Sequence, residues 1–518
     1  MRIHDIAVLG TMAVASGLAS PDVAAATVTQ TAYSAVIERV DCPFPVLRGD
    51  AASCFQATVP LHYADVAEDG SLPEGAPRIT LAVSVLENFV EMENPNPIVL
   101  ISGGPGQAAN DMLASVTTAL HLRRSRGIVL IDQRGTGASS PSLNCADASP
   151  LELDENRLND PEFSPESSVG DRLDACVQQW RADGVDFNAF DTRSAALDLL
   201  AIRRGFGIER WNLHGTSYGA RVVSDAMRVD PEGIRSAVLN SPQAVFAHFD
   251  RDFAESRLRL FSQLFEDCAG DSYCHENFGD LEAHLRKIHA HLVDEGMEIF
   301  LRESGSGKLQ RVNVDWEDVL NGLYTHMNFS FGAEPVARYI SELSRVVDGR
   351  LSLNDDEVAR IFQGSLSEDD DEMAIAMHLA VRCREDVPAY DAAVAAAAEQ
   401  QAPMFFAGAE GMGTYYDACE AMGIEPVDPS FYELVASDIP TLVLTGDMDP
   451  LTPTSWAERT AGALINGQLV SFRGMAHDIF STSICAQAIT ANFIDAPFSP
   501  VDDTCARSYR PVFSPVQQ

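Results

Sequence analysis

The chain has 518 residues, is 46% hydrophobic, and carries 76 acidic side chains against 36 basic ones. Its length exceeds that of one minimal core and predicts either two domains or one large domain with an insertion. The formal net charge of -40 argues against binding to nucleic acid, whose phosphates require Lys and Arg side chains. The acidic surface is either an adaptation to salt, which screens the repulsion between like charges, or a means of solubility.

The N-terminus has the pattern of a secretory signal peptide. An apolar run over residues 6–19 is followed by Val23-Ala24-Ala25-Ala26, small residues that are typical of a cleavage site. We therefore assign residues 1–26 to the signal and expect a secreted or periplasmic protein. No stretch of 18 or more apolar residues occurs later in the chain, so we expect no transmembrane anchor in the mature protein.

Ten cysteines, an even number, indicate structural disulfides formed in an oxidising compartment. Sequence alone does not determine the pairing, and reduced, buried cysteines are the alternative. The simplest pairing joins neighbours along the chain: Cys42 with Cys54, Cys145 with Cys176, Cys268 with Cys274, Cys383 with Cys419, and Cys485 with Cys505. No Cys-x-x-Cys pair occurs, which disfavours a zinc site, and we expect neither a metal nor another cofactor.

Several short apolar runs in the first half of the chain predict strands. Residues 78–86 alternate between apolar and polar side chains, whereas residues 97–102 and 127–132 are nearly continuous apolar runs of the kind that buried parallel strands show. Each of these two runs continues into a glycine-rich loop, which suggests a doubly wound sheet of the α/β class. Thr192 can cap a helix that closes at Gly205.

A serine lies at the centre of the heptapeptide 214–220, between a predicted strand at 210–213 and a predicted helix that starts at Ala220. The backbone must turn sharply there, and Gly215 and Gly219 supply the room, so Gly-x-Ser-x-Gly indicates a nucleophile elbow with Ser217 as the nucleophile. Taken alone the pattern is weak, because glycine and serine are common residues. A glycine-rich turn that caps a helix is the alternative.

The middle of the chain has a different pattern. From about residue 246 to 432 the buried-strand runs vanish, and amphipathic helical stretches appear, for example at 258–265, 281–292 and 373–381. Strand patterns resume at 439–445 and 467–472. We therefore predict a sheet core over 27–245, a helical cap insertion over 246–432, and the C-terminal part of the core over 433–518.

Two polar residues that follow the late strands complete a candidate catalytic triad. Asp449 follows the strand at 439–445 and His477 follows the strand at 467–472, so Ser217, Asp449 and His477 have the chain order of an α/β-hydrolase triad. Serine needs an imidazole to take its proton, and the imidazole needs a carboxylate to set its tautomer and stabilise its cation. Asp447 is the competing acid. His214, beside the elbow, is interpreted as a packed residue at the strand end.

The motif set resembles the tripeptidyl aminopeptidase-like α/β-hydrolases, which are secreted relatives of prolyl aminopeptidase. The motifs that carry the resemblance are Gly-Gly-Pro-Gly at 103–106, Asp-Gln-Arg-Gly-Thr-Gly at 132–137, Gly-Thr-Ser-Tyr-Gly at 215–219, Gly-Asp-Met-Asp-Pro-Leu-Thr-Pro at 446–453, and the late Cys485 and Cys505. One position departs from the family pattern, because Ser102 stands where a histidine usually opens the glycine loop. We infer that the oxyanion donors are the backbone N–H groups of Gly104 and Tyr218, which do not depend on that side chain.

The resemblance implies hydrolysis of a peptide bond near a free N-terminus, by an acyl-enzyme on Ser217. A carboxylesterase that acts on small esters with the same triad is the alternative, because acyl transfer from esters and amides uses the same groups. A non-catalytic binding protein is disfavoured by the complete triad. An exopeptidase also needs a carboxylate for the substrate ammonium. Glu385 or Asp386 in the cap is our candidate, and a solvent-facing charged turn is the alternative for both.

Overall fold

The structure is a computed structural model of the whole chain, and the predicted signal peptide at 1–26 lies outside the residues that it describes. The described residues are 32–43, 52–86, 96–110, 120–123, 126–144, 176–247, 249–294, 296–302, 309–329, 333–350, 373–401, 404–405 and 416–514.

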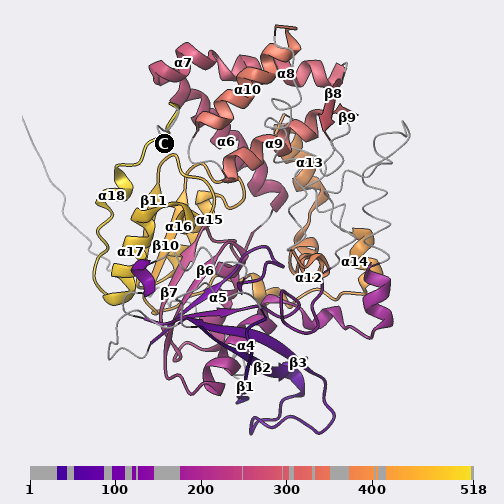
Figure 1. Cartoon of the computed structure of the whole chain (residues 1–518), viewed down its shortest axis with the longest axis vertical. Helices are drawn as coiled ribbons and strands as arrows, with labels where there is room; N and C mark the ends of the chain where they lie inside the picture. Colours follow the sequence, from indigo (N-terminus) through magenta and orange to yellow (C-terminus); the bar gives the residue numbers. More distant parts are fainter. Residues whose placement is uncertain are drawn as a thin grey trace, which may run out of the picture.

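The lower half of the molecule in Figure 1 is built on one mixed sheet. Within the described residues this sheet has nine strands in the order β1-β2-β3-β5-β4-β6-β7-β10-β11. The strands from β1 to β5 in this order pair antiparallel, and every pair from β5 to β11 is parallel. Their bounds are β1 Val36–Val40, β2 Ala52–Pro60, β3 Arg78–Leu86, β4 Ile98–Ile101, β5 Ile128–Ile131, β6 Trp211–Thr216, β7 Ile234–Asn240, β10 Thr441–Gly446 and β11 Gly467–Phe472.

Both faces of the sheet are buried, which explains the continuous apolar runs of its central strands. In β4, Val99 and Ile101 join the core that includes α4 (Thr192–Gly205) and α5 (Tyr218–Val229), whereas Ile98 and Leu100 join a second core on the opposite face. That second core includes α17 (Ile484–Asp495). The short helices α2 (Leu120–Arg123), α16 (Ile479–Thr482) and α18 (Thr504–Arg507) also contribute to it, and α15 (Thr454–Ala463) connects β10 to β11. The doubly wound α/β fold that the sequence predicts is confirmed.

The strands that the sequence predicts are observed to within a few residues. β1 was not predicted, because its residues are exposed or half-buried and it forms no apolar run. One local detail differs. Thr192 is the first residue of α4, and the N-cap is Asp191, whose side chain accepts a hydrogen bond from the Ser194 N–H. A carboxylate one residue earlier therefore satisfies a free N–H of the first turn in place of the Thr192 hydroxyl.

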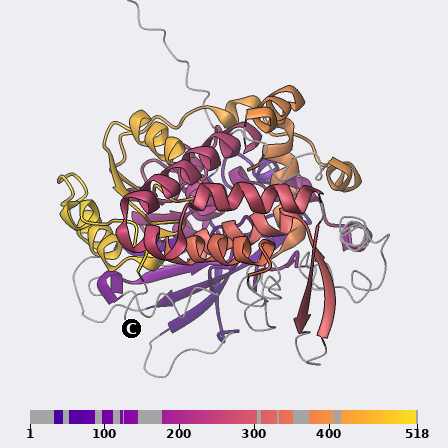
Figure 2. The same ribbon diagram turned by 90° about the horizontal axis from the view of Figure 1, so that it is seen from above.

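Helices between β7 and β10 form the upper half of the molecule, the cap (Figures 1 and 2). The helices within 249–347 bury a core of their own, which includes Leu260, Phe261, Leu323 and Ile340, whereas those at 375–381 and 416–422 pack into the same core as α4 and α5. The helices are α6 Phe249–Gly270, α7 Ser272–Phe278, α8 Leu281–Asp294, α9 Trp316–Phe329, α10 Glu334–Val347, α12 Ile375–Val381, α13 Ala392–Gln401 and α14 Tyr416–Met422. The sequence did not predict the antiparallel hairpin of β8 (Met297–Arg302) and β9 (Leu309–Val314), which stands at the side of the cap.

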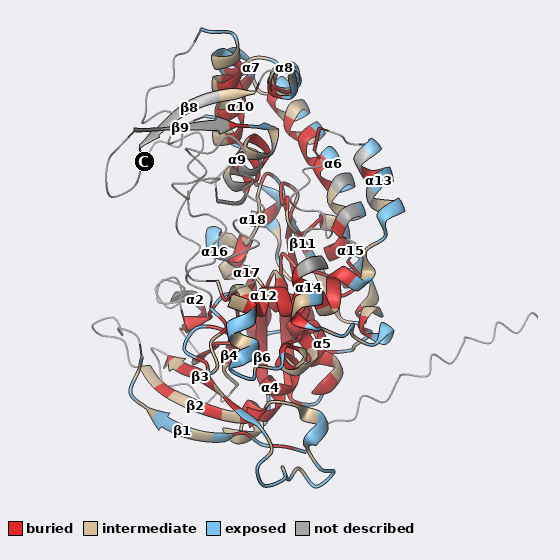
Figure 3. Ribbon diagram, turned by 90° about the vertical axis from the view of Figure 1, so that its right-hand side faces the viewer, coloured by how far each residue is buried: buried red, intermediate tan, exposed pale blue. Residues whose placement is uncertain are grey.

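The cap stands over the edge of the sheet at which the parallel strands end, and buried residues run through the junction between the two halves (Figure 3). Met448, just after the end of β10, and Phe513 near the C-terminus belong to the cap core. The catalytic candidates at the ends of β6, β10 and β11 are therefore placed between the sheet and the cap. Among the described helices, none combines the length and the apolar character that a membrane crossing requires.

Four of the five expected disulfides fall within the described residues, and all four have the expected pairing: Cys42–Cys54, Cys268–Cys274, Cys383–Cys419 and Cys485–Cys505. The fifth expected pair includes Cys145, which lies outside the described residues. The bond between Cys383 and Cys419 fixes the segment after α12 to α14. It therefore anchors the part of the cap that returns to the core.

Candidate active site

Ser217 occupies a strained turn between β6 and α5. Its backbone has φ 55° and ψ -120°, a conformation that costs an L-residue free energy and that clusters at functional sites. The turn is held on both sides, because the Ser217 N–H donates to the Asn240 carbonyl at 2.9 Å and the Ser217 carbonyl accepts the N–H groups of Ala220 and Gln243. This rigid turn presents a partly exposed hydroxyl at the end of the strand.

The two glycines of the elbow are required by close contacts between backbones. A Cβ atom on Gly215 would lie 2.3 Å from the Gly219 carbonyl oxygen, and one on Gly219 would lie 2.3 Å from the carbonyl oxygen of Ile101 in β4. Real Cβ atoms do not approach backbone so closely, so a side chain at either position would push α5 away from the sheet. The Gly-x-Ser-x-Gly pattern thus reflects the packing of this turn, as the elbow interpretation requires.

Asp449 and His477 face each other from the loops after β10 and β11. His477 Nδ1 lies 2.8 Å from Asp449 Oδ2, and the side chain of Asp449 is fully buried. The loop around Asp449 saturates its carboxylate: the N–H groups of Leu451 and Thr452 donate to Oδ1, and the Thr452 hydroxyl donates to Oδ2 at 2.6 Å. Both hydrogen bonds of His477 to described residues involve Nδ1, and none joins its ring to the Ser217 hydroxyl.

The two groups stabilise each other's charged forms. Burial would raise the pKa of Asp449, but the neighbouring His477 and the hydrogen bonds from His477 and Thr452 outweigh it, so this pKa lies below its ordinary value. Burial would likewise lower the pKa of His477, but the charge and hydrogen bond of Asp449 outweigh that effect and raise it. Such a pair holds the proton on Nδ1 of the neutral ring and stabilises the imidazolium that forms when the ring takes a proton.

Asn240, the last residue of β7, joins the serine turn to the histidine loop. Its carbonyl receives the Ser217 N–H. Its side-chain amide donates to the Asp478 carboxylate at 2.7 Å, directly after His477 in the chain. Asp478 itself has a left-handed backbone with φ 50°, which turns the chain away after the histidine. The structure therefore brings the elbow and the histidine loop together through one buried amide.

The two competing residues have other environments. Asp447 accepts the Gly474 N–H at 2.6 Å and so ties the loop after β10 to the loop after β11. His214 is buried against the Phe480 ring, and burial lowers its pKa to about 4. His214 is thus a packed residue within β6, and the geometry places Asp449, not Asp447, beside the catalytic candidate His477.

The glycine loop after β4 lies against the elbow. A Cβ atom on Gly103 would be 3.1 Å from the Ser217 Cβ, and Gly104 has φ 100°, which favours glycine. The Ser102 hydroxyl donates to the Gln107 carbonyl at 2.6 Å and so closes the loop, while the Gln133 side-chain amide donates to the Ser102 carbonyl. Tyr218 is the first residue of α5, where backbone N–H groups have no partner inside the helix. The backbone N–H groups of Gly104 and Tyr218 are the two that we expect to bind an oxyanion.

Comparison with known families agrees with this geometry. A family model described as the alpha/beta hydrolase fold matches residues 96–276, which include Ser217. A second model, described as TAP-like protein, matches residues 403–505, which include Asp449 and His477. The chain is an α/β-hydrolase whose C-terminal region matches the TAP-like family.

Curated relatives of this hydrolase are distant. The serine protease Hip1 of Mycobacterium tuberculosis strain H37Rv is 24% identical over 446 residues, which are 79% of this chain and 80% of that protein. YuaR of Escherichia coli strain K12, a protein named as a hydrolase, is 27% identical over 188 residues, and this match spans only 35% of YuaR.

Solved structures also align with this chain. A proline iminopeptidase from Mycobacterium smegmatis aligns with a TM-score of 0.39 and 15% identity, over 81% of this chain and 96% of that one. An esterase from Thermogutta terrifontis aligns with a TM-score of 0.35 and 13% identity, over 82% and 95% of the two chains. At these TM-scores the two alignments carry no further argument.

The predicted amine-binding residues of the hydrolase lie in a different environment from the one expected. Glu385 and Asp386 are buried, and both pair with Arg221 of α5, at 3.1 and 2.9 Å. Glu385 also accepts the backbone and hydroxyl hydrogens of Thr192, and Asp386 pairs with Arg382 at 2.8 Å. The charge of Asp386 is compensated inside the protein, because Arg221 and Arg382 outweigh burial and lower its pKa, whereas burial outweighs Arg221 at Glu385 and raises the pKa of that carboxyl to about 7. This environment argues against both the amine-anchor interpretation and the solvent-facing turn.

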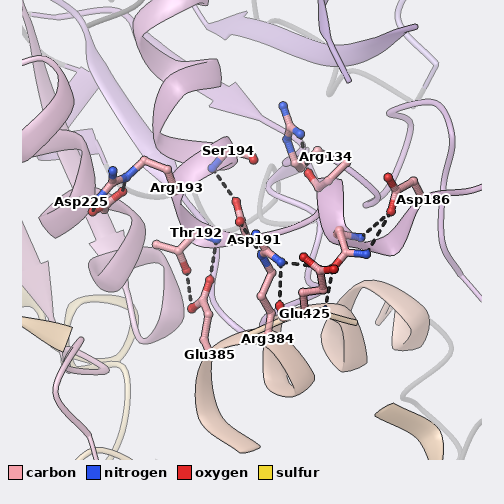
Figure 4. A network of polar contacts seen from close by, with 12 residues as sticks. Arg134, Asp186, Asp191, Thr192, Arg193, Ser194, Asp225, Arg384, Glu385 and Glu425 are labelled. Carbon is pink, nitrogen blue, oxygen red and sulfur yellow. Dashed lines mark hydrogen bonds and ion pairs between the residues drawn. The ribbon is translucent and has the colours of Figure 1, made fainter. Parts of the chain in front are cut away.

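The same network joins the cap to the core (Figure 4). Arg384 donates to the Asp191 carboxylate at the start of α4 and to the carbonyl of Glu425, and Thr192 next to Asp191 contacts Glu385. The chain after α12 is therefore fastened to the N-terminus of α4 by several charge-assisted hydrogen bonds.

Sequence reasoning missed the supporting residues of this site. Asn240, Thr452 and Gln133 each hold a catalytic candidate or its loop. Thr452 and Gln133 lie within motifs that carry the family resemblance, at 446–453 and 132–137, but we assigned them no role, and Asn240 lies in none of these motifs. Only Thr452 had a local signal, because a hydroxyl three residues after an Asp commonly bonds back to it in a capped turn. Asn240 and Gln133 act across 238 and 31 residues of sequence, at distances where no local pattern applies.

Proposed function

We propose that this hydrolase is a secreted serine exopeptidase, an aminopeptidase of prolyl or tripeptidyl type, that cleaves peptides from a free N-terminus. The observation that carries the proposal is the buried Asp449–His477 pair at 2.8 Å, on loops that meet the strained Ser217 turn through Asn240. Ser217 is the nucleophile, His477 the general base and acid, and Asp449 the orienting acid. The N–H groups of Gly104 and Tyr218 form the oxyanion hole.

The proposed reaction proceeds through an acyl-enzyme. Ser217 Oγ attacks the scissile carbonyl carbon while His477 Nε2 takes the hydroxyl proton, and the oxyanion receives the N–H groups of Gly104 and Tyr218. His477 then gives its proton to the amine nitrogen, the C–N bond breaks, and the new peptide N-terminus leaves. Water attacks the resulting ester while His477 takes a proton from it. Return of that proton to Ser217 releases the N-terminal fragment as a carboxylic acid.

Peptidases and esterases of this fold use the same catalytic groups, but two observations support a peptidase. The C-terminal region matches the TAP-like family model, and the relative that aligns over most of the chain is named a serine protease. Secretion is supported by the four described disulfides, because such bonds persist in oxidising compartments. A carboxylesterase that acts on small esters is the competing outcome of the experiment below.

The test compares peptide p-nitroanilides that have a free N-terminus with the same peptides after N-acetylation, and with p-nitrophenyl butyrate. A charge-assisted hydrogen bond to the substrate ammonium contributes roughly 1.5 to 3 kcal/mol, so acetylation should lower kcat/KM by about 10- to 150-fold. Ser217→Ala should lower all activities by roughly 10^3-fold or more without unfolding the protein. Equal cleavage of free and acetylated peptides would refute the exopeptidase assignment. Turnover of the ester alone would favour the carboxylesterase.

A further inference from the structure

The glycine loop that is expected to bind the oxyanion is held from two sides. The core supports its inner side through Ser102 and Gln133, as described above. The cap supports its outer side through the residues that lead into α12. The Ala374 N–H donates to the Gly106 carbonyl at 3.0 Å, and Met373 forms a β-bridge with Gln107. Residues of the cap insertion therefore pack against the outer side of this loop.

His378, one turn into α12, contacts the same loop through its side chain. Its Nδ1 lies 3.0 Å from the Pro105 carbonyl oxygen. A carbonyl oxygen can only accept a hydrogen bond, so Nδ1 must carry the proton and donate. Burial, with a smaller contribution from Arg382, lowers the pKa of His378 to about 4, so the ring is neutral near pH 7. The donor is therefore present near pH 7 without a buried positive charge.

The loop needs such a support because three of its residues, Gly103, Gly104 and Gly106, have no side chain. Gly104 and Gly106 have φ of 100° and 113°, in a region that glycine enters readily, and neither has a side chain that could pack the loop in place. The carbonyl that His378 binds belongs to Pro105, the residue between these two glycines. The Gly104 N–H lies two peptide units before this carbonyl, so a shift of the carbonyl is transmitted along the short loop to that donor.

We propose that His378 is a positioning residue of the oxyanion hole: its hydrogen bond to Pro105 fixes the Gly104 N–H against Ser217, and so makes the cap a part of the catalytic site. The proposal rests on the function proposed above. The hydrogen bond acts on the donor that meets the developing oxyanion and on no group that binds the ground-state substrate. Its loss should therefore lower kcat and leave KM nearly unchanged.

The test uses a matched pair of variants, His378→Asn and His378→Leu. The two side chains have nearly the same shape, but only the Asn amide offers an N–H close to the position of Nδ1. We expect His378→Leu to lower kcat on a peptide anilide by about 10- to 100-fold, below the loss of a whole donor, which is about 10^2- to 10^3-fold. His378→Asn should stay within about 3-fold of the wild type. His275→Ala, at an exposed position of α7, is the control for substitution of a cap histidine.

A second readout separates positioning from general damage. A peptide aldehyde forms a hemiacetal whose oxygen enters the oxyanion hole, so His378→Leu should weaken its inhibition by the same factor as kcat, at constant KM. Equal losses in the Leu and Asn variants, or no loss in either, would overturn the proposal. If the Leu variant does not fold, the Asn variant decides alone: wild-type kcat and aldehyde affinity support the hydrogen bond, and a loss above 10-fold refutes it.

The outcome also distinguishes this inference from the proposed function. A fluorophosphonate that fails to label Ser217 in the wild-type protein would refute the catalytic assignment itself. Labelling of Ser217 at an unchanged rate in His378→Leu would refute only the role of His378.

Discussion

The substitution Asp449→Asn changes one atom of the site, and the structure determines how the new side chain must sit. Oδ1 of Asp449 receives two backbone N–H groups, from Leu451 at 2.8 Å and Thr452 at 2.9 Å. These donors cannot turn into acceptors, so the amide oxygen of an asparagine must keep that place. Its NH2 group then takes the place of Oδ2 and points at His477 Nδ1, 2.8 Å away.

An NH2 group at that place forces the histidine into the wrong tautomer. His477 must accept at Nδ1, so its proton moves to Nε2, and Nε2 can no longer take the proton of Ser217. The Thr452 hydroxyl can adapt by rotating, because it accepts as well as donates. A loss of about 10^4-fold in kcat is expected for this change of tautomer, which corresponds to about 5.5 kcal/mol of barrier at roughly 1.36 kcal/mol per tenfold.

The assay is steady-state hydrolysis of a peptide anilide and of p-nitrophenyl butyrate, with circular dichroism and thermal unfolding as checks of the fold. Asp447→Asn is the matched control, because Asp447 contacts the Gly474 N–H and not the imidazole, and it should keep kcat within a few-fold. An Asp449→Asn enzyme that retains a tenth of the wild-type kcat would refute the tautomer argument. A larger loss in Asp447→Asn would show that the acid has been misassigned.

Two further predictions concern the pH profile and the cap. Burial alone would lower the pKa of His477, but Asp449 raises this pKa above 6.5. Because only the neutral ring accepts a proton, kcat/KM should fall toward acid pH with an apparent pKa above 6.5. An acid limb centred at a lower pH would contradict this prediction. Replacing both Cys383 and Cys419 by Ala removes a disulfide with a sequence separation of 36 and should lower the free energy of unfolding by about 3 to 4 kcal/mol. Denaturant unfolding measures this free energy. An unchanged denaturation midpoint would show that the disulfide adds no stability.

Local patterns in the sequence were sufficient to predict the sheet and the order of the catalytic candidates. A buried strand such as β5 needs apolar residues at every position, and this requirement is visible in the chain whatever the partners are. The elbow is local only in part: Gly215 is needed by the backbone of Gly219, four residues later, whereas Gly219 is needed by the backbone of Ile101 in the distant strand β4. The hairpin of β8 and β9 was missed, because it lies within an insertion where helical periodicity dominates the pattern.

Tertiary structure decided what depends on partners far away in the chain. Asp447 and Asp449 share one loop, and only the packing of the loop after β11 shows which of them faces His477. The charged turn of Glu385 was interpreted as a substrate anchor because its partner Arg221, 164 residues earlier, has no local signal. By itself the sequence determined which side chains could perform the chemistry. Their distances, burial and protonation arise from contacts between segments that meet only in the folded chain, so only the folded structure decided which of them can act together.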